Sequence, residues 1–316
     1  MISAGGAFLC AGNIVQDILV RPVERVAFDA TAWVESIELR LGGNGSNTSY
    51  TLAKLGAPTR ALGLVGADDF GDKVLSKMSE AGVDCTSVGR GPSATASTVV
   101  LVKADGTRGF LHCPGASMDA FAELIEFPEN SGLTHFHLAN LFSLPHMRRL
   151  ATDNLWKARD ANLSTSMDTG WDSRGEWIGA LKPCLPYLDL LFVNQGEARW
   201  LTGHEDPRRA AQTFRDAGVP VVVIKLGARG CAVFSESGEL SAPGYSVPVV
   251  DTTGAGDCFA GGFLAALHRG AALSDAARFA NAVGALSVQK LGSVEGVLTY
   301  EETLNWMAVP VGEAAS

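Results

Sequence analysis

Short, continuous apolar runs recur along the chain and alternate with stretches of helical periodicity. Runs that are apolar at nearly every position are typical of strands buried on both faces of a sheet. The runs lie at Ala7–Gly12, Arg60–Val65, Thr134–Ala139, Leu163–Asp168, Asp189–Val193 and Val219–Lys225. The helical stretches lie at Asn44–Leu55, Asp69–Ala81, Leu144–Ala161 and Pro207–Ala217. This alternation predicts an α/β fold with a doubly wound, mostly parallel sheet, which binds its ligands at the carboxyl ends of the strands.

Two segments, at about 18–41 and 97–112, depart from this alternation. Apolar and polar residues alternate in them as in β-ribbons, and the second segment turns at Asp105–Gly106. We expect them to form a small β-sheet that projects from the main sheet and covers the site as a lid. The alternative is two surface hairpins without a function. Because no repeat or long linker interrupts the chain, we expect residues 1–316 to form one domain with this lid.

Charge and cysteine usage narrow the class of protein. The chain has 316 residues and a formal net charge of -9, which argues against nucleic acid as a partner. A phosphorylated small molecule is not excluded, because a few backbone amides can hold a phosphate. No apolar run approaches the ~18 residues of a membrane helix. The first residues lack the basic region of a signal peptide, and the six cysteines form no C-x-x-C pair. We expect a reduced, cytoplasmic protein without a membrane partner.

The segment from 247 to 270 combines a possible anion-binding turn with a possible proton acceptor. Val249 and Val250 are expected to end a short strand, and Gly254, Ala255 and Gly256 form a turn that opens an apolar helix. The unpaired N–H groups and the dipole of such a helix attract an anion. Asp257 would repel a bound phosphate there unless it accepts a proton from an attacking hydroxyl. The alternative is an ordinary helix N-terminus, where Gly and Asp are common.

Two longer signatures show a family resemblance. DTTGAGDCFAGGF, beginning at Asp251, resembles the second signature of the ribokinase-like (PfkB) carbohydrate kinases, and LGGNGSNTSYTLAKLGAPTRALGLVGADDFGD, beginning at Leu41, resembles the first. The resemblance implies a kinase that transfers the γ-phosphate of ATP to a hydroxyl group of a small sugar or sugar derivative. Asp257 would be the base, and the amides of Gly254, Ala255 and Gly256 would stabilise the phosphoryl oxygens. No P-loop or protein-kinase motif is present.

The resemblance also implies an acceptor site. Relatives bind the hydroxyls of their substrate through the Gly-Gly turn, the helix that follows it, the aspartate after the first strand, and the lid. The matching residues are Asp17, Gly42, Gly43, Asn44, Asn47, Arg108 and His112. Asn47 is expected to open its helix, and the alternative is that it only caps that helix. Ribokinase itself has lysine at the position of Asn44, a difference that argues against ribose.

On the nucleotide side, the resemblance implies contacts with ATP and Mg²⁺. The matching nucleotide-binding residues are Asn194, Lys225, Gly227, Gly230 and Asn281. Glu197, in the N-x-x-E motif, would act on Mg²⁺ through water. Asp251 and Thr253 would hold a monovalent cation, expected to be K⁺, with further carbonyl ligands near Ser287–Gly292.

Two other functions remain open from the sequence. The same fold serves nucleoside and vitamin-precursor kinases, and a non-catalytic sugar-binding regulator would keep the fold without the activity. The intact Asp257 argues against the regulator. The lid is also a surface through which a homodimer could form.

Overall fold

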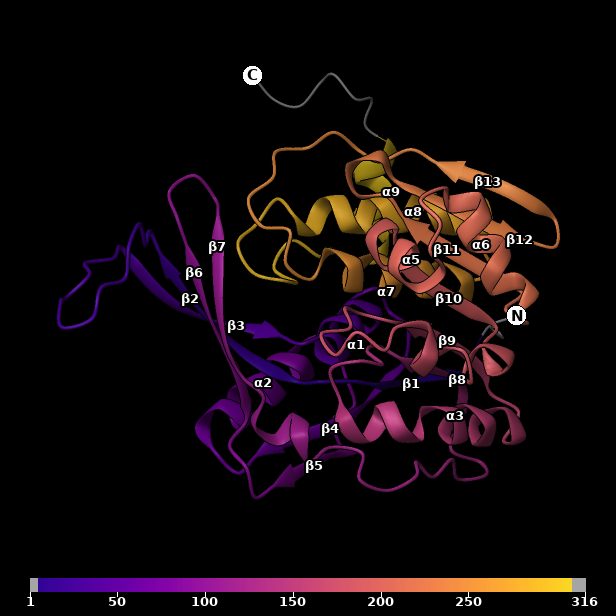
Figure 1. Ribbon diagram of the computed structural model, residues 1–316, viewed down its shortest axis with the longest axis horizontal. Coiled ribbons are helices and arrows are strands. Elements are labelled where there is room, and N and C mark those ends of the chain that lie inside the picture. The colour runs from indigo at the N-terminus through magenta and orange to yellow at the C-terminus, as the bar shows by residue number, and fades with distance from the viewer. Residues whose placement is uncertain (1–4, 309–316) are drawn as a thin grey trace.

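A nine-stranded sheet forms the centre of the structure, a computed structural model that describes residues 5–308 (Figure 1). Its strands, in spatial order, are β13 (Gly238–Ala242), β12 (Cys231–Ser235), β11 (Val221–Lys225), β10 (Leu190–Asn194), β9 (Ser164–Asp168), β8 (Leu133–Leu138), β1 (Ala7–Ala11), β4 (Thr59–Gly66) and β5 (Val88–Gly91). The strands from β11 to β5 pair in parallel, and β12 and β13 form an antiparallel hairpin at one edge. The predicted doubly wound, mostly parallel sheet is confirmed.

Helices cover both faces of this sheet, which explains why its strands are apolar at consecutive positions. One face packs against α1 (Asn44–Lys54), α2 (Asp69–Glu80), α7 (Ala255–His268) and α8 (Leu273–Ser287), with α9 (Tyr300–Ala308) beside α8. The other packs against α3 (Pro145–Asp160), α4 (Ile178–Leu181), α5 (Gln195–Thr202) and α6 (Pro207–Asp216). Phe192 of β10 enters the first core, whereas its neighbours Leu191 and Val193 enter the second. Within residues 5–308, no helix has the length and apolar character needed to cross a bilayer.

The sequence pattern failed where strands are short or the chain is irregular. The β12–β13 hairpin and β5 were not predicted, because short edge strands leave only a weak pattern. The strand expected at Val249 and Val250 is wrong: the chain is irregular from 243 to 250, and both side chains are largely exposed. Three short 3₁₀ turns complete the described structure, η1 (Gly115–Met118), η2 (Leu185–Tyr187) and η3 (Gly227–Arg229).

A second, four-stranded sheet projects from the main one and forms the predicted lid (Figure 1). Its order is β3 (Ser36–Gly42), β2 (Val15–Arg21), β6 (Ala96–Val102) and β7 (Arg108–Cys113). A parallel pairing of β2 with β6 joins the two segments, while β2–β3 and β6–β7 are antiparallel. The β6–β7 turn contains Gly106 at φ 83, a left-handed conformation that favours glycine. Asp17, Thr98 and His112 are neighbours across the strands and therefore share one face.

Two glycines bring the start of α1 onto the end of β1. A Cβ added to Gly12 would lie 2.6 Å from the Cα of Gly45, and one added to Gly45 would lie 2.6 Å from the Cα of Gly12. No larger side chain fits at either position without moving the helix. This close approach places the first turn of α1 at the carboxyl end of the sheet, where it can face α7.

Candidate active site

Asp257 lies in the first turn of α7, directly after the glycine turn. Gly254 caps the helix at φ 72, and a Cβ there would lie 2.6 Å from the Cβ of Ser293. Glycine is therefore required both by the backbone conformation and by the space available. No side chain caps α7, so the first N–H groups of the helix, together with its dipole, face the carboxyl edge of the sheet.

A chain of amide hydrogen bonds holds the Asp257 carboxylate in place. Asn44 donates to its Oδ1 at 2.8 Å, and Asn47 donates to its Oδ2 at 2.9 Å. Asn140 in turn donates to the side-chain oxygen of Asn44, and Ser293 donates to that of Asn47, both at 2.8 Å. Both carboxylate oxygens are thus fixed by amides that are themselves fixed.

The expectation that Asn47 opens its helix is wrong, because α1 begins at Asn44 with Gly43 as its N-cap. No side chain makes a capping hydrogen bond at that end. The Asn47 side chain instead spans the gap between Asp257 and Ser293. The alternative of a simple helix cap does not describe these contacts.

The protonation of Asp257 is poised near neutrality. Burial raises the pKa of its carboxyl to about 7, and repulsion from Asp168 acts in the same direction. Hydrogen bonds from Asn47 and Asn44, and the charge of Lys225, oppose this rise. A carboxylate with this pKa is a stronger proton acceptor than an ordinary aspartate.

A cavity of ≈ 220 Å³ lies between the inner face of the lid and the starts of α1 and α7. Most residues expected to bind the acceptor meet there. Those that line it are Asp17, Gly43, Asn44, Asn47 and His112, and the rest of the lining includes Thr253, Gly254 and Asp257 as well as the apolar Val15, Val100 and Phe110. None of the described residues that line this cavity is a lysine or an arginine. The cavity therefore offers hydrogen-bonding groups and two acids, but no lysine or arginine.

Asp17 and Gly42 form one unit beside this cavity. Burial raises the pKa of Asp17 to about 7, Thr98 opposes that rise through a hydrogen bond, and the charge of Asp251 adds to it. Gly42 does not line the cavity; a Cβ at this position would overlap the Asp17 carboxyl group. Gly42 thus leaves room for Asp17. His112 lies 3.0 Å (Nδ1) from the Thr98 hydroxyl, and burial lowers its pKa.

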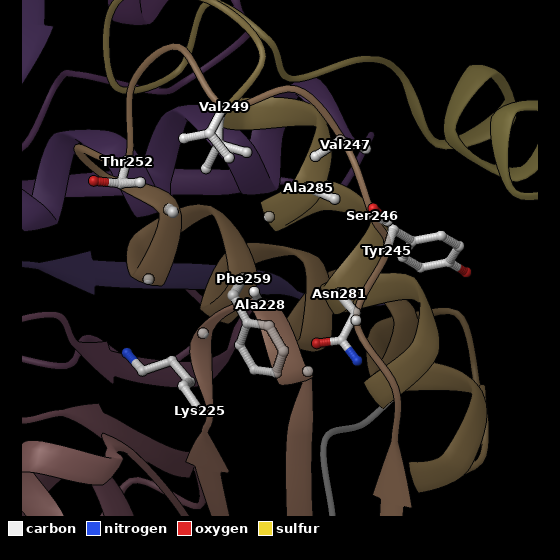
Figure 2. Close-up of a pocket in the computed structure, with 17 residues that line it drawn as sticks. Lys225, Ala228, Tyr245, Ser246, Val247, Val249, Thr252, Phe259, Asn281 and Ala285 are labelled. Carbon is white, nitrogen blue, oxygen red and sulfur yellow. The ribbon is translucent and has the colours of Figure 1, made fainter. Parts of the chain in front are cut away.

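A larger cavity of ≈ 480 Å³ lies on the other side of the glycine turn (Figure 2). Lys225, Gly227, Gly230 and Asn281, four of the five residues expected to bind the nucleotide, line it. In Figure 2, Phe259 lies between Lys225 and Asn281, which occupy different ends of the cavity.

The two cavities share the turn as their common wall. Thr252, Ala255 and Gly256 line the larger cavity, while the intervening Thr253 and Gly254 line the smaller one with Asp257. A group transferred from one cavity to the other would pass the N–H groups at the start of α7.

Lys225, at the end of β11, places a positive charge beside the glycine turn. Its ammonium group forms an ion pair with Asp168, and both side chains are largely buried. A Cβ added to Gly256 would lie 3.1 Å from the Lys225 Nζ, so the ammonium group is adjacent to the glycine turn. Burial opposes the charged form of Lys225, but Asp168 and Glu197 outweigh it, and the pKa of the amine is raised overall.

Asn194 and Glu197 line neither cavity. The Asn194 side chain accepts a hydrogen bond from the Glu197 N–H, and the Glu197 carboxylate accepts one from the Asn194 N–H, both at 2.8 Å. This capping box starts α5. Glu197 is buried, which raises its pKa, and Lys225 acts against that rise. Among residues 5–308, no three His, Cys, Asp or Glu side chains are grouped to hold a metal ion.

Arg108 and Asn281 make protein contacts that the sequence did not suggest. Arg108 lines neither cavity; its guanidinium forms an ion pair with Asp251 at 2.9 Å and contacts the Thr253 hydroxyl at 3.2 Å. The structure thus separates Arg108 from the other acceptor residues and places it on the expected cation ligands. The Asn281 amide donates to the carbonyls of Ala242 and Pro243.

Among the polar residues of the site that sequence reasoning missed are Asn140, Asp168 and Ser293. Asp168 ends β9, and Asn140 follows β8. The rule that ligands bind at the carboxyl ends of parallel strands could have identified both of them. Ser293 lies in an irregular segment and carries no comparable signal.

Comparison with known protein families identifies the class of this protein. The family model described as "pfkB family carbohydrate kinase" matches residues 8–299, and the chain belongs to this family. The predicted family and the predicted class of enzyme, a carbohydrate kinase, are confirmed.

The relatives include kinases with different acceptors. The chain is 28% identical to fructokinase-1 of Oryza sativa subsp. japonica, over 92% of this chain and 95% of that protein. It is also 28% identical to aminoimidazole riboside kinase of Salmonella typhimurium, over 84% and 86%. A solved structure described as a putative ribokinase II in complex with ATP and Mg²⁺ from E. coli matches with a TM-score of 0.85 and 27% identity, covering 97% of this chain and 99% of that one.

The pKa of Asp257 predicts an acidic limb in the rate profile. If Asp257 must be deprotonated, kcat/KM for the acceptor falls about tenfold per pH unit below about pH 7, rather than below the ordinary ~3.9. Asn47→Ala removes a hydrogen bond that lowers this pKa, so the limb should move to higher pH. Asp17→Asn is the control, because the pKa of Asp17 is also raised to about 7. A limb centred near pH 4, or one abolished by Asp17→Asn, would contradict the assignment.

Proposed function

We propose that this protein transfers the γ-phosphoryl group of ATP to a hydroxyl group of a neutral sugar or riboside. The observation that carries this proposal is the Asp257 carboxylate, held by two amides at a helix N-terminus between two cavities. A base next to an anion-binding turn is what an attacking hydroxyl and a transferring phosphoryl group require together. The main sheet and its lid would act as one kinase domain.

The charges of the smaller cavity support a neutral acceptor. Asp17 and Asp257 line it, and no lysine or arginine does. A carboxylated or phosphorylated sugar would bring a negative charge to these two acids without a partner to neutralise it. Aspartate and asparagine side chains accept and donate hydrogen bonds, and so suit the hydroxyls of a sugar ring. The rice fructokinase and the riboside kinase among the relatives carry names that fit this class of acceptor.

The residues around the turn suggest how the transfer proceeds. Asp257 would orient the acceptor hydroxyl and take its proton as the oxygen attacks the γ-phosphorus. The N–H groups of Gly254, Ala255 and Gly256 would stabilise the charge on the transferring oxygens, with the Lys225 ammonium beside them. The adenosine portion would occupy the larger cavity toward Asn281. Closure of the lid would exclude water, which otherwise competes with the acceptor.

The nucleotide would bring Mg²⁺ to this edge of the sheet. Carboxylate oxygens are ligands that Mg²⁺ prefers, and Asp168 and Glu197 are both close enough to Lys225 to influence its pKa. These two residues would hold waters of the ion, and Asn194 would keep Glu197 in position. When bound, Mg²⁺ neutralises part of the phosphate charge.

Replacing the base should separate catalysis from binding. Asp257→Asn keeps the shape of the side chain but removes the proton acceptor, so kcat should fall about 10²–10⁴-fold while the Kd for ATP stays close to wild type. The assay is MgATP with a panel of hexoses, pentoses, ribosides and keto-deoxy sugar acids. Asp275→Asn is the matched control, because Asp275 is exposed and lies in the first turn of α8.

Two outcomes would overturn this assignment. A kcat in the Asp257 variant above about a tenth of wild type would remove Asp257 as the base. No transfer to any member of the panel would favour a sugar-binding regulator, and preferred use of sugar acids would refute the neutral acceptor.

Replacing Asp17 should weaken the binding of the acceptor but not that of ATP. Losing a buried hydrogen bond to a hydroxyl costs about 1–3 kcal/mol, so Asp17→Ala should raise the KM for the acceptor roughly 5–150-fold. The KM for ATP should stay unchanged, because Asp17 lines the smaller cavity and not the larger one. Steady-state kinetics with each substrate varied in turn measures both values. Equal changes in the two would show a general loss of structure instead.

The outer face of the lid supports a homodimer. The face opposite Asp17 and His112 carries apolar side chains, among them Ile37, Leu39 and Leu111, which are 66%, 39% and 64% exposed. An exposed apolar sheet face favours a second layer that covers it, and the same face of a second copy provides one through twofold symmetry. Light scattering should give the mass of a dimer for the wild type and of a monomer for Leu39→Asp with Leu111→Asp. A monomeric wild type would exclude the dimer.

A further inference from the structure

The Asp251 carboxylate is the buried centre of the loop that leads into the glycine turn. Its Oδ1 accepts a hydrogen bond from the Thr253 N–H at 2.8 Å, and its Oδ2 accepts one from the Gly292 N–H at 2.9 Å. The side chain is only 3% exposed. A charged group buried this deeply needs a counter-charge nearby. The resemblance to the family assigns that role to a monovalent cation at Asp251 and Thr253.

In this chain the counter-charge comes from the lid. Nη1 of Arg108 lies 2.9 Å from Asp251 Oδ1, 3.2 Å from the Thr253 hydroxyl and 3.3 Å from the Thr252 hydroxyl. Nη2 lies 3.3 Å from the carbonyl oxygen of Val250. The guanidinium is therefore surrounded by one carboxylate, two hydroxyl groups and one carbonyl oxygen, and it shares the Asp251 carboxylate with the expected cation.

We infer that the guanidinium of Arg108 takes the place of the monovalent cation, so that this kinase works without K⁺. The inference rests on the proposed kinase function. One positive charge already balances Asp251, and in residues 5–308 no other cation forms an ion pair with this carboxylate. A K⁺ ion bound to Asp251 would meet the repulsion of the adjacent guanidinium, whose side chain is only 14% exposed. The residues present do not fit the ion that the resemblance implies.

The same contact links the lid to the anion-binding turn. Arg108 is the first residue of β7, whereas Asp251 lies three residues before Gly254. A diffusible ion would support the turn whatever the position of the lid, but Arg108 supports it only while the β6–β7 hairpin lies against the 250–253 segment. Arg108 is therefore a positioning residue: it acts on the N–H groups of the turn through Asp251.

The test compares cations in the wild type and in Arg108→Ala. Phosphotransfer and thermal unfolding are measured in KCl, NaCl and choline chloride at matched ionic strength. The wild type should keep the same rate, within about twofold, and the same Tm in all three salts. Arg108→Ala should lose about tenfold or more of its rate in choline chloride, because the turn is no longer held in place. K⁺ should restore both its rate and its Tm, since the oxygens of the site are then free to bind the ion.

Other variants separate substitution of a cation from simple loss of structure. Arg108→Lys keeps a positive charge and should remain indifferent to K⁺. Arg108→Gln is the milder replacement if the alanine variant fails to fold, and it should respond to K⁺ as the alanine variant does. Arg60→Ala is the matched control, because Arg60 pairs with Asp84 at 2.8 Å in another part of the main sheet. It should show no preference for K⁺.

The Tm measurements need no acceptor, so they decide the inference even if the protein phosphorylates nothing. A wild type that K⁺ activates or stabilises would overturn it. Arg108 variants whose Tm values are the same in K⁺ and in choline would overturn it as well. Absence of phosphotransfer in every salt, with the expected Tm pattern, would refute the proposed function and leave the replacement of the cation supported.

Discussion

The structure depends on keeping one carboxylate, that of Asp257, buried and yet able to ionise at the start of a helix. Burial opposes the charge, and the neighbouring Asp168 adds to that cost. Two asparagine amides from α1 and the ammonium group of Lys225 offset it. The close contact of Gly12 with Gly45 brings α1 within reach of α7. This packing of the backbone allows the two amides of α1 to stabilise the charge of Asp257.

The distribution of charge divides the site into two halves. The polar lining of the smaller cavity is mainly acids and amides, with no lysine or arginine, which suits hydroxyl groups. The larger cavity has Lys225 at one end and an apolar wall that includes Phe259, Val247 and Val249, which suits a phosphate chain and a flat base. The N–H groups at the start of α7 lie between the halves, where a phosphoryl group in transit would carry its charge.

The lid contributes more than a cover. One face brings Asp17 and His112 to the smaller cavity, the opposite face is apolar and exposed, and the hairpin sends Arg108 to Asp251. Each role depends on the register of four strands drawn from two distant segments. A shift of one residue in β7 would exchange the inner and outer faces and remove the guanidinium from Asp251.

The sequence by itself determined the layered fold, the lid and the glycine turn with Asp257, and it identified the family. Short stretches of sequence predict these features: continuous apolar runs predict the sheet, and alternation around Asp105–Gly106 predicts the lid. The signature that begins at Asp251 predicts the glycine turn and the helix after it. Only the tertiary structure decided which polar groups meet. Asn140 reaches Asn44 across 96 positions, Ser293 reaches Asn47 across 246, and Arg108 reaches the Thr253 hydroxyl, beside Asp251, across 145. Spacing in the sequence does not encode such pairs, because they arise only when helices and strands have packed.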